Sequence, residues 1–407
     1  MTSDGGAKLR RIIDDEDQYF ASIRIEKLIV SSSASGPFLL RIGAYSDSIS
    51  YVQYRDTVFQ LPSGSTITQL YIGGSGALRT FTAGQNGALE RLSIADCLFD
   101  RLPPTLGNMV SLQRLAINKC LLTGLRMDML AANRNLRDVD LAENKIRQLF
   151  PLTANKDTAE LTVATINLAN NQIELLDMAV FASLTELKRL NLRNNGITQL
   201  GASAPIIFPS LTSLLVSYNK ISSVNLANVT FSELSLVNLD ENALTNVPTQ
   251  LGKFPNRLVL SLAQNKLKRV DLSMLRPISS TLEQVFFSSN EIEFVHASTP
   301  ITMPRLKLLV LEENRLTTIN LTGCELPNIS AIGLSNNLFR TVPTLFQRFP
   351  NVQLSLDGNP LKCSTLLSLK NRLTEARLII NTIRITDQCP TNGSIPYNNK
   401  NKACCFN

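Results

Sequence analysis

Residues that usually carry out catalysis are scarce in this sequence. The 407-residue chain has no tryptophan and a single histidine, His296, and only 6% of its residues are aromatic. Histidine is the side chain used most often as a general acid or base, so its scarcity argues against most acid–base enzymes. No G-x-S-x-G, H-E-x-x-H or P-loop motif occurs either. We therefore predict a protein that is not an enzyme, that uses no cofactor or metal, and in which His296 has a structural place.

Long apolar runs and runs of like charge are also absent. The chain has no stretch of about 18 uncharged apolar residues, so neither a transmembrane helix nor direct membrane insertion is expected. Its 40 basic and 33 acidic residues give a net charge of +7, but they are dispersed, which disfavours nucleic-acid binding. The start, MTSDGGAKLRRIIDDEDQYF, lacks the apolar core of a signal peptide. The chain is thus either cytoplasmic or a mature or truncated form of a secreted protein.

A repeated leucine pattern fills most of the chain. The segments LKRLNLRNNGI (187–197), LTSLLVSYNKI (211–221) and LKLLVLEENRL (306–316) share the template L-x-x-L-x-L-x-x-N-x-L, which is typical of leucine-rich repeats. Copies begin near residues 67, 89, 112, 136, 163, 187, 211, 234, 257, 282, 306, 329 and 351. A degenerate copy fits at Ile49, Val52, Tyr54, Thr57 and Phe59. The spacing of 22 to 27 residues predicts a stack of coils, each contacting its neighbours.

Position 9 of the template predicts a ladder of buried polar side chains. An asparagine amide there can bond to backbone groups of neighbouring coils and so satisfy buried polar atoms. The ladder residues are Asn144, Asn171, Asn195, Asn219, Asn242, Asn265, Asn290, Asn314, Asn337 and Asn359. Ser75, Cys97 and Cys120 hold this position in the first copies. We interpret Cys97 and Cys120 as buried thiols, with a disulfide between adjacent coils as the alternative.

The repeat predicts an α/β leucine-rich repeat solenoid, or horseshoe. A parallel β-sheet would form the concave face, and irregular or short helical segments would form the convex face. Four regions are expected: a flexible segment at 1–18, a β-rich and cysteine-free N-terminal cap with the degenerate repeat at 19–66, about 13 repeats at 67–361, and a C-terminal cap at 362–407. In the C-terminal cap an amphipathic helix is indicated by Leu366, Leu367, Leu369, Leu373 and Leu378.

The cysteines of the C-terminal cap indicate an oxidising compartment. Cys363, Cys389, Cys404 and Cys405 lie within 43 residues and predict a disulfide framework. A zinc site is the rival interpretation, but the chain has no C-x-x-C and no histidine nearby.

Four N-x-S/T sequons support secretion. They are Asn228, Asn320, Asn328 and Asn392, and all lie off the predicted strands, on the convex side, the rim or the cap. The remaining cysteine, Cys324, is expected to be buried, with pairing to a partner as the alternative.

The cap pattern resembles a known family. The order repeat, single Cys, helix, single Cys and Cys-Cys pair in GNPLKCSTLLSLKNRL…DQCPTNGSIPYNNKNKACCFN resembles the end of the repeat region in the mosquito leucine-rich immune proteins. This resemblance implies a secreted haemolymph protein of insect innate immunity without catalytic activity. It also implies protein partners, namely complement-like thioester proteins or a second leucine-rich repeat protein, and a disulfide-linked dimer in which one of Cys404 and Cys405 bridges to the partner chain.

One feature departs from that family pattern. No heptad region follows the cap, because the sequence ends at Asn407. The chain therefore corresponds either to a member without a coiled coil or to one cut before it. The alternative function is the ectodomain of a leucine-rich repeat receptor or adhesion protein.

The concave face offers a candidate binding surface for a protein partner. Its exposed template positions are 2, 3, 5, 7 and 8. A basic cluster comprises Arg114, Arg137, Lys188, Arg189 and Arg193, and an acidic cluster comprises Asp240, Glu241, Glu283, Glu312 and Glu313. Position 5 is usually polar but becomes apolar at Leu215, Phe286 and Val310, which suggests an anchor for a partner. The alternative is scattered surface apolarity with ordinary solvated charge.

Overall fold

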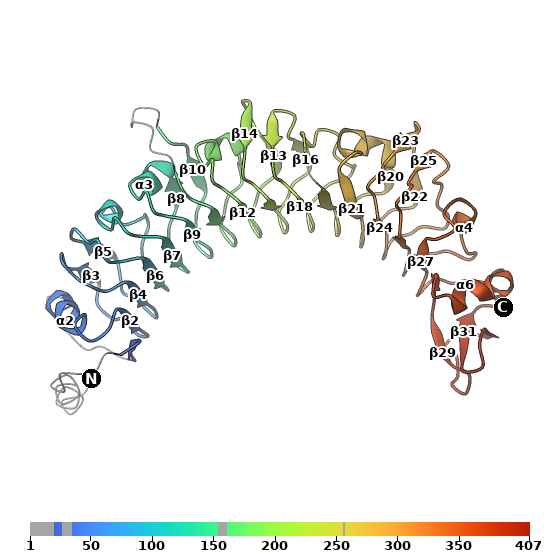
Figure 1. Cartoon of the computed structure of the whole chain (residues 1–407), viewed down its shortest axis with the longest axis horizontal. Helices are drawn as coiled ribbons and strands as arrows, with labels where there is room; N and C mark the ends of the chain where they lie inside the picture. Colours follow the sequence, from blue (N-terminus) through green and yellow to red (C-terminus); the bar gives the residue numbers. More distant parts are fainter. Residues whose placement is uncertain (1–19, 27–34, 154–160, 255–256) are drawn as a thin grey trace. The chain divides into compact units, whose positions relative to one another are not determined.

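The computed structural model describes residues 20–26, 35–153, 161–254 and 257–407, so the predicted segment 1–18 lies outside the described residues. The predicted leucine-rich repeat solenoid is confirmed, with parallel strands from successive coils forming one face and short elements forming the other (Figure 1). The chain forms two compact units. The first comprises Met1–Ile197 and Ile206–Leu211, and the second Thr198–Pro205 and Thr212–Asn407.

The inner sheet of the first unit takes one short parallel strand from each coil. Its strands, in sheet order, are β1 (Ile23–Ile25), β2 (Ser48–Tyr51), β4 (Gln69–Ile72), β6 (Arg91–Ala95), β7 (Arg114–Asn118), β9 (Asp138–Asp140), β11 (Thr165–Asn167) and β12 (Arg189–Asn191). Template positions 4 and 6 face the core, as Leu190 and Leu192 do, and both are fully buried. Positions 3 and 5 therefore point to the open side of the sheet.

The outer layer of the first unit consists of short elements. They are β3 (Val58–Leu61), β5 (Thr80–Ala83), η1 (Leu106–Asn108), β8 (Gly124–Arg126), α3 (Met127–Ala131), β10 (Gln148–Phe150), η2 (Met178–Phe181) and β14 (Ile206–Phe208). Two parallel strand pairs, β3 with β5 and β8 with β10, were not expected from the sequence. Outer segments of similar length lie beside one another in a stack, so their backbones can pair as the inner strands do.

The second unit repeats this arrangement. Its inner strands are β15 (Ser213–Leu215), β18 (Leu236–Asn238), β19 (Leu258–Ser261), β21 (Leu282–Phe286), β24 (Leu308–Val310), β26 (Ala331–Gly333), β27 (Gln353–Ser355) and β28 (Leu378–Ile379). Its outer elements are β13 (Gln199–Gly201), β16 (Ser223–Asn225), β17 (Val229–Phe231), β20 (Arg269–Asp271), η3 (Leu272–Ile278), β22 (Phe294–His296), β23 (Ile301–Thr302), β25 (Cys324–Glu325) and α4 (Leu345–Arg348).

A left-handed residue and the asparagine after it turn the chain at the end of each inner strand. Position 8 has a positive φ in coil after coil, for example 52° at Asn194 and 58° at Glu143. The amide Nδ2 of Asn195 then donates to the carbonyl oxygens of Leu168, one coil back, and of Leu192 in its own coil. Its Oδ1 accepts from the backbone N–H of Ile173 at 3.0 Å. The predicted asparagine ladder is therefore present, and it bonds backbone groups of adjacent coils.

Two repeat copies differ from the prediction only at their first residue, and the degenerate copy differs in register. The buried first residue is Leu258 rather than residue 257, and Val352 rather than residue 351. The degenerate copy begins three residues earlier than predicted, because Ile49 lies beside Leu70 in the sheet and Tyr51 beside Ile72.

Tyr51 explains this last shift. Its ring is fully buried and packs edge-on against Phe59, with 5.6 Å between the ring centroids. Val52, which the prediction placed in the core, is only half-buried. The larger apolar ring thus takes the core position, since it removes more apolar surface from water.

The two caps differ in detail from the predictions. The N-terminal cap pairs β1 with β2, but it also contains the helix α2 (Ser35–Ile42), which buries Leu39 and Ile42. The C-terminal cap has α5 (Cys363–Leu366), η4 (Leu367–Leu369) and α6 (Lys370–Thr374) in place of one continuous helix. Leu367 is 58% exposed and Leu378 lies in strand β28, so neither belongs to a buried helical face.

The end of the C-terminal cap is a small antiparallel sheet held by two disulfides. The sheet order is β29 (Thr382–Arg384), β31 (Asn401–Cys405) and β30 (Gly393–Pro396). Cys363 pairs with Cys405 and Cys389 pairs with Cys404, with Cα atoms 5.0 and 5.5 Å apart. Both sulfurs of the Cys404–Cys405 pair thus have partners within the cap, which contradicts the interchain bridge implied by the family resemblance.

A third disulfide joins two coils of the first unit. Cys97 and Cys120 occupy position 9 of adjacent coils, and their Cα atoms are 4.6 Å apart. Stacking brings equivalent positions of neighbouring coils within disulfide reach. The interpretation of two separate buried thiols was therefore wrong, and the alternative, a disulfide between adjacent coils, is correct.

Candidate functional site

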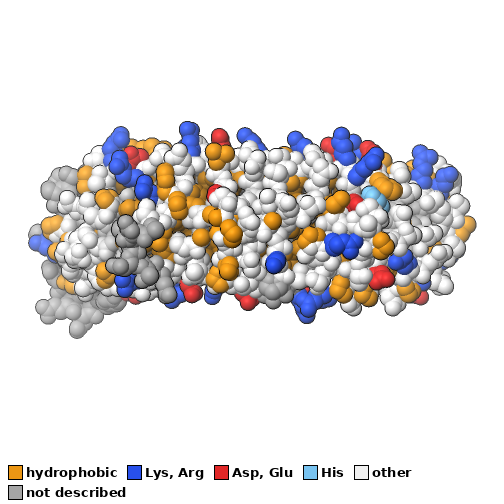
Figure 2. Space-filling model, turned by 90° about the horizontal axis from the view of Figure 1, so that it is seen from above, with side chains coloured by type: hydrophobic (Ala, Val, Ile, Leu, Met, Phe, Trp, Pro, Cys, Tyr) orange, Lys and Arg blue, Asp and Glu red, His pale blue; other side chains and the backbone are white. Residues whose placement is uncertain are grey.

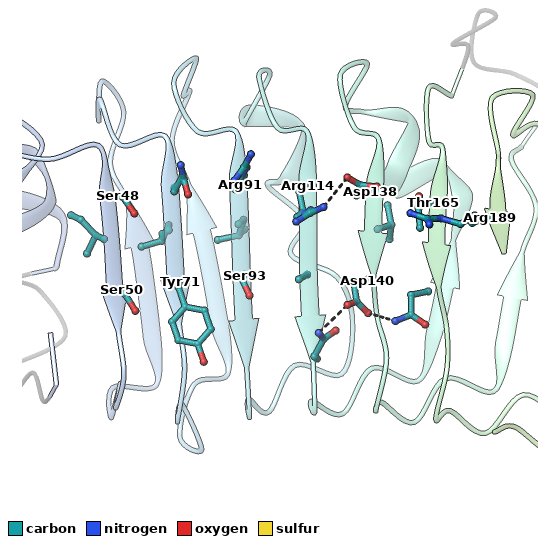
Figure 3. Close-up of a pocket in the computed structure, with 18 residues that line it drawn as sticks. Ser48, Ser50, Tyr71, Arg91, Ser93, Arg114, Asp138, Asp140, Thr165 and Arg189 are labelled. Carbon is teal, nitrogen blue, oxygen red and sulfur yellow. Dashed lines mark hydrogen bonds and ion pairs between the residues drawn. The ribbon is translucent and has the colours of Figure 1, made fainter. Parts of the chain in front are cut away.

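The inner face of the first unit contains a polar groove of about 620 Å³. The groove crosses the strands from β2 to β12, and its open lining comes from template positions 3 and 5 together with Asn118 at position 7 (Figure 3). The core residues below it, such as Leu70 and Leu92, are at most 2% exposed. The surface that a ligand would meet is therefore made almost entirely of hydroxyl, amide, carboxylate and guanidinium groups.

A row of charged side chains follows position 3 along this groove. Arg91 lies beside Arg114 on the next strand, and Arg114 lies beside Asp138. Nη2 of Arg114 is 3.3 Å from Oδ2 of Asp138. Arg189 stands further along, beside Thr165.

Of the predicted basic cluster, Arg114 and Arg189 line the groove. Arg137, Lys188 and Arg193 are exposed but lie outside the groove lining, at template positions 2 and 7. The structure therefore places this cluster along several strands and does not gather it in one patch.

One end of the groove is closed by internal hydrogen bonds. The carboxylate of Asp140 accepts from Nδ2 of Asn167 at 2.9 Å and from the backbone N–H of Ala142 at 3.2 Å. Nδ2 of Asn191 donates in turn to Oδ1 of Asn167 at 2.9 Å. These side chains satisfy one another, so they hold adjacent strands together and offer little to a ligand.

The inner face of the second unit is more apolar. Leu236 lies beside Val259 at position 3, and Leu308 occupies position 3 two strands beyond Val259, with Gln284 between them. Phe286 and Val310 are neighbours at position 5 of β21 and β24, the strands of Gln284 and Leu308. We call Leu236, Val259, Phe286, Leu308 and Val310 the apolar inner patch.

The sequence reasoning found this patch only in part. Phe286 and Val310 were predicted as neighbours and are neighbours, but Val310 is 9% exposed and contributes little open surface. Leu215 is half-buried and lies three strands from Phe286, with Asn238 and Ser261 between them at position 5. The three position-3 members of the patch, Leu236, Val259 and Leu308, were missed. Comparing the residue at position 3 from one repeat to the next, as was done for position 5, predicts them from the sequence.

The acidic residues beside the patch have different roles. Asp240 is held by its neighbours, since Oδ1 accepts from Ser261 at 2.5 Å and Oδ2 from Nδ2 of Asn238 at 2.9 Å. Glu241 and Glu313 are the left-handed position-8 residues of their coils.

Glu312 remains a candidate contact for a partner, whereas Glu283 has a basic neighbour. A hydrogen bond from Nζ of Lys307, at 2.5 Å, lowers the pKa of Glu283. The acidic border of the patch is therefore narrower than predicted and consists of Glu241, Glu312 and Glu313.

The remaining predicted residues lie away from the inner sheets. Asn228, Asn320, Asn328 and Asn392 are exposed and off the strands, as expected. His296, on β22, stacks against Phe294 with 4.9 Å between the ring centroids. Cys324 is fully buried, as predicted, and this burial raises its pKa to about 11.

The described residues of the outer face form no single charged patch. In Figure 2 most of the Lys and Arg side chains lie toward its margins, with hydrophobic side chains between them. Among the residues described, no group of three or more His, Cys, Asp or Glu could hold a metal ion. The described helices also include none with the length and apolarity needed to cross a bilayer.

Comparison with known proteins identifies the repeats. Residues 162–221 match the family model described as Leucine rich repeat. Podocan-like protein 1 of Homo sapiens is 29% identical over 168 residues, which cover 35% of this chain and 32% of that protein. Keratocan of Gallus gallus is 28% identical over 207 residues, covering 48% of this chain and 56% of that protein. The chain thus covers less than two thirds of the length of these relatives.

Solved structures show the same fold at lower identity. The chain superposes on a mosquito LRIM1/APL1C complex with a TM-score of 0.59 at 18% identity, covering 96% of this chain and 70% of that one. The APL1 leucine-rich repeat domain gives a TM-score of 0.55 at 14% identity, covering 96% and 98%. A leucine-rich repeat protein of Leptospira interrogans gives 0.51 at 18% identity, covering 92% and 98%. At these identities the similarity shows the fold alone.

Proposed function

We propose that this leucine-rich repeat protein is secreted, is not an enzyme, and binds another protein through the apolar inner patch. The observation that carries the proposal is the row of Leu236, Val259 and Leu308 on the solvent side of a sheet whose first-unit counterpart is polar. Apolar groups on the open side of a rigid sheet are suited to bury against a partner, and a few such anchors supply most of the affinity of an interface.

The border of the patch suggests the chemistry of the partner. Glu241, Glu312 and Glu313 lie at positions 7 and 8, along one edge of the apolar inner patch. A partner with an apolar ridge flanked by Lys or Arg would match both features. The charges would mainly guide association, whereas the apolar contacts would supply affinity.

Two features support an extracellular location. The cap contains two disulfides within its last 45 residues, and disulfides persist in oxidising compartments. All four sequons are exposed and away from the inner sheets, so glycans there would leave the apolar inner patch open.

The partner that we propose is a protein of insect innate immunity, either a complement-like thioester protein or a second leucine-rich repeat protein. The order of cysteines in the cap supports this assignment, together with the fold similarity to the LRIM1/APL1C complex, itself an assembly of two proteins. Cys404 and Cys405 both pair within the cap, so no disulfide between chains is proposed. Association through the cap or the sheet would be noncovalent.

The test compares leucine substitutions on two faces. In the first variant Leu236 and Leu308 are both replaced by Ser, and in the control Leu338, which is 49% exposed outside the inner sheet, is replaced by Ser. Binding to a purified insect thioester protein and to a purified mosquito leucine-rich repeat protein is measured by biolayer interferometry. We expect Kd to rise at least about tenfold for the double variant and to stay within about twofold for the control.

Two results would count against the proposal. Equal Kd values for both variants would show that the apolar inner patch is not part of the interface. A full-length transcript that encodes an apolar span after the cap would instead indicate the ectodomain of a receptor or adhesion protein.

A further inference from the structure

The end of the polar groove nearest the N-terminus carries polar side chains without partners. Gln69, Tyr71, Arg91 and Ser93 line it, and none of these side chains has a hydrogen-bond or ion-pair partner among the described residues. This contrasts with the Asp140 end, where the side chains bond to one another. Unpartnered donors gathered in a groove on a rigid sheet are available to a ligand.

Tyr71 forms an aromatic surface in this part of the groove. It lies between Ser50 and Ser93 on the neighbouring strands, and it is 40% exposed (Figure 3). The small serines leave the ring uncovered on both sides. Gly73 directly follows β4, the strand of Tyr71. It leaves space for the phenol group of Tyr71, because a Cβ atom at residue 73 would meet the ring.

Arg91 and Arg114 form a basic pair at position 3 of the two strands that follow β4, whereas Tyr71 is at position 5 of β4 (Figure 3). They are neighbours at position 3 of β6 and β7, and both are exposed. Like charges directly opposite each other on adjacent strands repel. Arg114 has Asp138 on its other side at 3.3 Å, whereas Arg91 has no carboxylate within 4.0 Å among the described residues. An anionic group bound between them would relieve this repulsion and accept charge-assisted hydrogen bonds.

The lining also indicates what kind of molecule would carry that anion. The leucines below this end, Leu70 and Leu92, are buried, and no aliphatic side chain larger than Ala116 is open to the groove here. A protein segment would therefore find no pocket for an apolar anchor, unlike on the second unit. Hydroxyl, amide and guanidinium groups beside an exposed ring suit a ligand with many hydroxyls, a flat sugar face and a negative charge.

We propose that Gln69, Tyr71, Arg91, Ser93 and Arg114 form a binding site for an acidic oligosaccharide. One sugar ring packs on Tyr71, a carboxylate or sulfate of a neighbouring sugar lies between Arg91 and Arg114, and hydroxyls of the chain bond to Gln69 and Ser93. These residues are one end of a groove of about 620 Å³ that continues to Arg189, so a short oligosaccharide can extend beyond them along the sheet. This site lies within the first unit, so it goes beyond the proposed protein-binding function and does not depend on it.

The experiment uses the full chain and three probes. A hexameric oligogalacturonate carries carboxylates, a heparin-derived hexasaccharide carries sulfates, and maltohexaose is neutral. Binding is measured by isothermal titration calorimetry in about 0.15 M salt, where screening weakens distant charges. The variants are Arg91→Gln, Tyr71→Ala and the control Arg79→Gln, which removes an exposed charge next to the outer strand β5 of the same unit.

We expect at least one acidic probe to bind, and maltohexaose to bind at least tenfold more weakly. Arg91→Gln and Tyr71→Ala should each weaken binding about tenfold or more, since each removes a direct contact. Arg79→Gln should change it less than about twofold. All three side chains are exposed, so thermal unfolding should be unchanged. A comparison of Kd for the carboxylated and the sulfated probe identifies which anionic group the site binds.

Four outcomes would overturn the proposal. No binding of either acidic probe would do so, as would equal binding of maltohexaose. An equal loss in Arg91→Gln and Arg79→Gln would indicate general attraction to a chain of net charge +7. Competition by a hexaglutamate peptide as strong as by the saccharides would show that the site reads charge alone and not the sugar.

Discussion

Replacing Asn265 by Ala should destabilise the second unit strongly, because one buried amide serves four backbone groups. Nδ2 of Asn265 donates to the carbonyl oxygens of Leu239 at 2.9 Å, Leu262 at 3.2 Å and Ala263 at 3.1 Å. Its Oδ1 accepts from the backbone N–H of Leu244 at 3.0 Å. Asn265 is 7% exposed, so water cannot readily replace it.

The expected magnitude follows from these four bonds. Each net hydrogen bond contributes about 1 kcal/mol, and a buried N–H left without a partner costs about 1–3 kcal/mol. The carbonyl oxygens have a second lone pair and lose less. We therefore expect Asn265→Ala to lower the free energy of unfolding by about 3 kcal/mol.

A second substitution tests the donor role separately. In Asn265→Asp, one carboxylate oxygen can still accept from Leu244, but the other would face the three carbonyl oxygens that Nδ2 now serves. Repulsion and burial would raise the pKa of this new carboxyl group above its unfolded value. The protonated carboxyl group would stabilise the folded variant at low pH, and this stabilisation would be lost as pH rises through the folded pKa. Relative to wild type, the free energy of unfolding of the variant should therefore be higher at pH 5 than at pH 7.

The assay is urea unfolding of the full chain followed by circular dichroism, with hydrogen exchange at the Leu244 amide as a local measurement. Stacked repeats can unfold in parts, so the local measurement assigns the loss to this coil. Asn246→Ala is the matched control, because Asn246 is exposed and donates only to Thr245 at 3.2 Å. A change in Asn265→Ala no larger than in this control would refute the ladder argument.

Three further predictions concern other parts of the chain. Replacing both Cys363 and Cys405 by Ser should cost about 4 kcal/mol by loop-closure entropy, seen as a lower Tm and faster proteolysis of the cap; an unchanged Tm would contradict this. Cys324, with its pKa raised to about 11, should react with iodoacetamide at pH 8 only after unfolding, as mass spectrometry would reveal. Burial opposes ionisation of Asp271, but hydrogen bonds from Ser298 and Ser273 lower its pKa overall. Its stabilising effect should therefore be present above about pH 4 and be lost as pH falls further, and Asp271→Ala should flatten this part of the stability–pH curve.

Much of the fold was predictable because each coil contacts only its neighbours. Positions 4 and 6 are apolar in every copy, so the buried side of each strand can be read from one coil at a time. The role of Asn195 could be predicted in the same way, since its partners lie in its own coil or the adjacent one. The prediction failed where a copy is irregular. At the degenerate copy, the buried ring of Tyr51 decided the register, and this depends on its packing against Phe59.

The candidate sites were less predictable because they depend on which coils lie side by side. Val259 and Leu308 are 49 residues apart in the chain, yet they belong to one patch with a single strand between them. The polar groove was missed for the same reason. Tyr71 and Arg91 are unremarkable alone, and only their places on adjacent strands, with serines beside the ring, create an open site.

The sequence by itself determined the repeat, the buried face of each strand, the asparagine ladder and the presence of cysteine-containing caps, because all of these arise from local periodicity. Only the tertiary structure decided how the cysteines pair. Cys97 bonds to Cys120 because stacking places position 9 of one coil next to position 9 of the next. Cys404 and Cys405 bond to different partners, Cys389 and Cys363, because neighbouring residues on strand β31 point to opposite faces of the sheet.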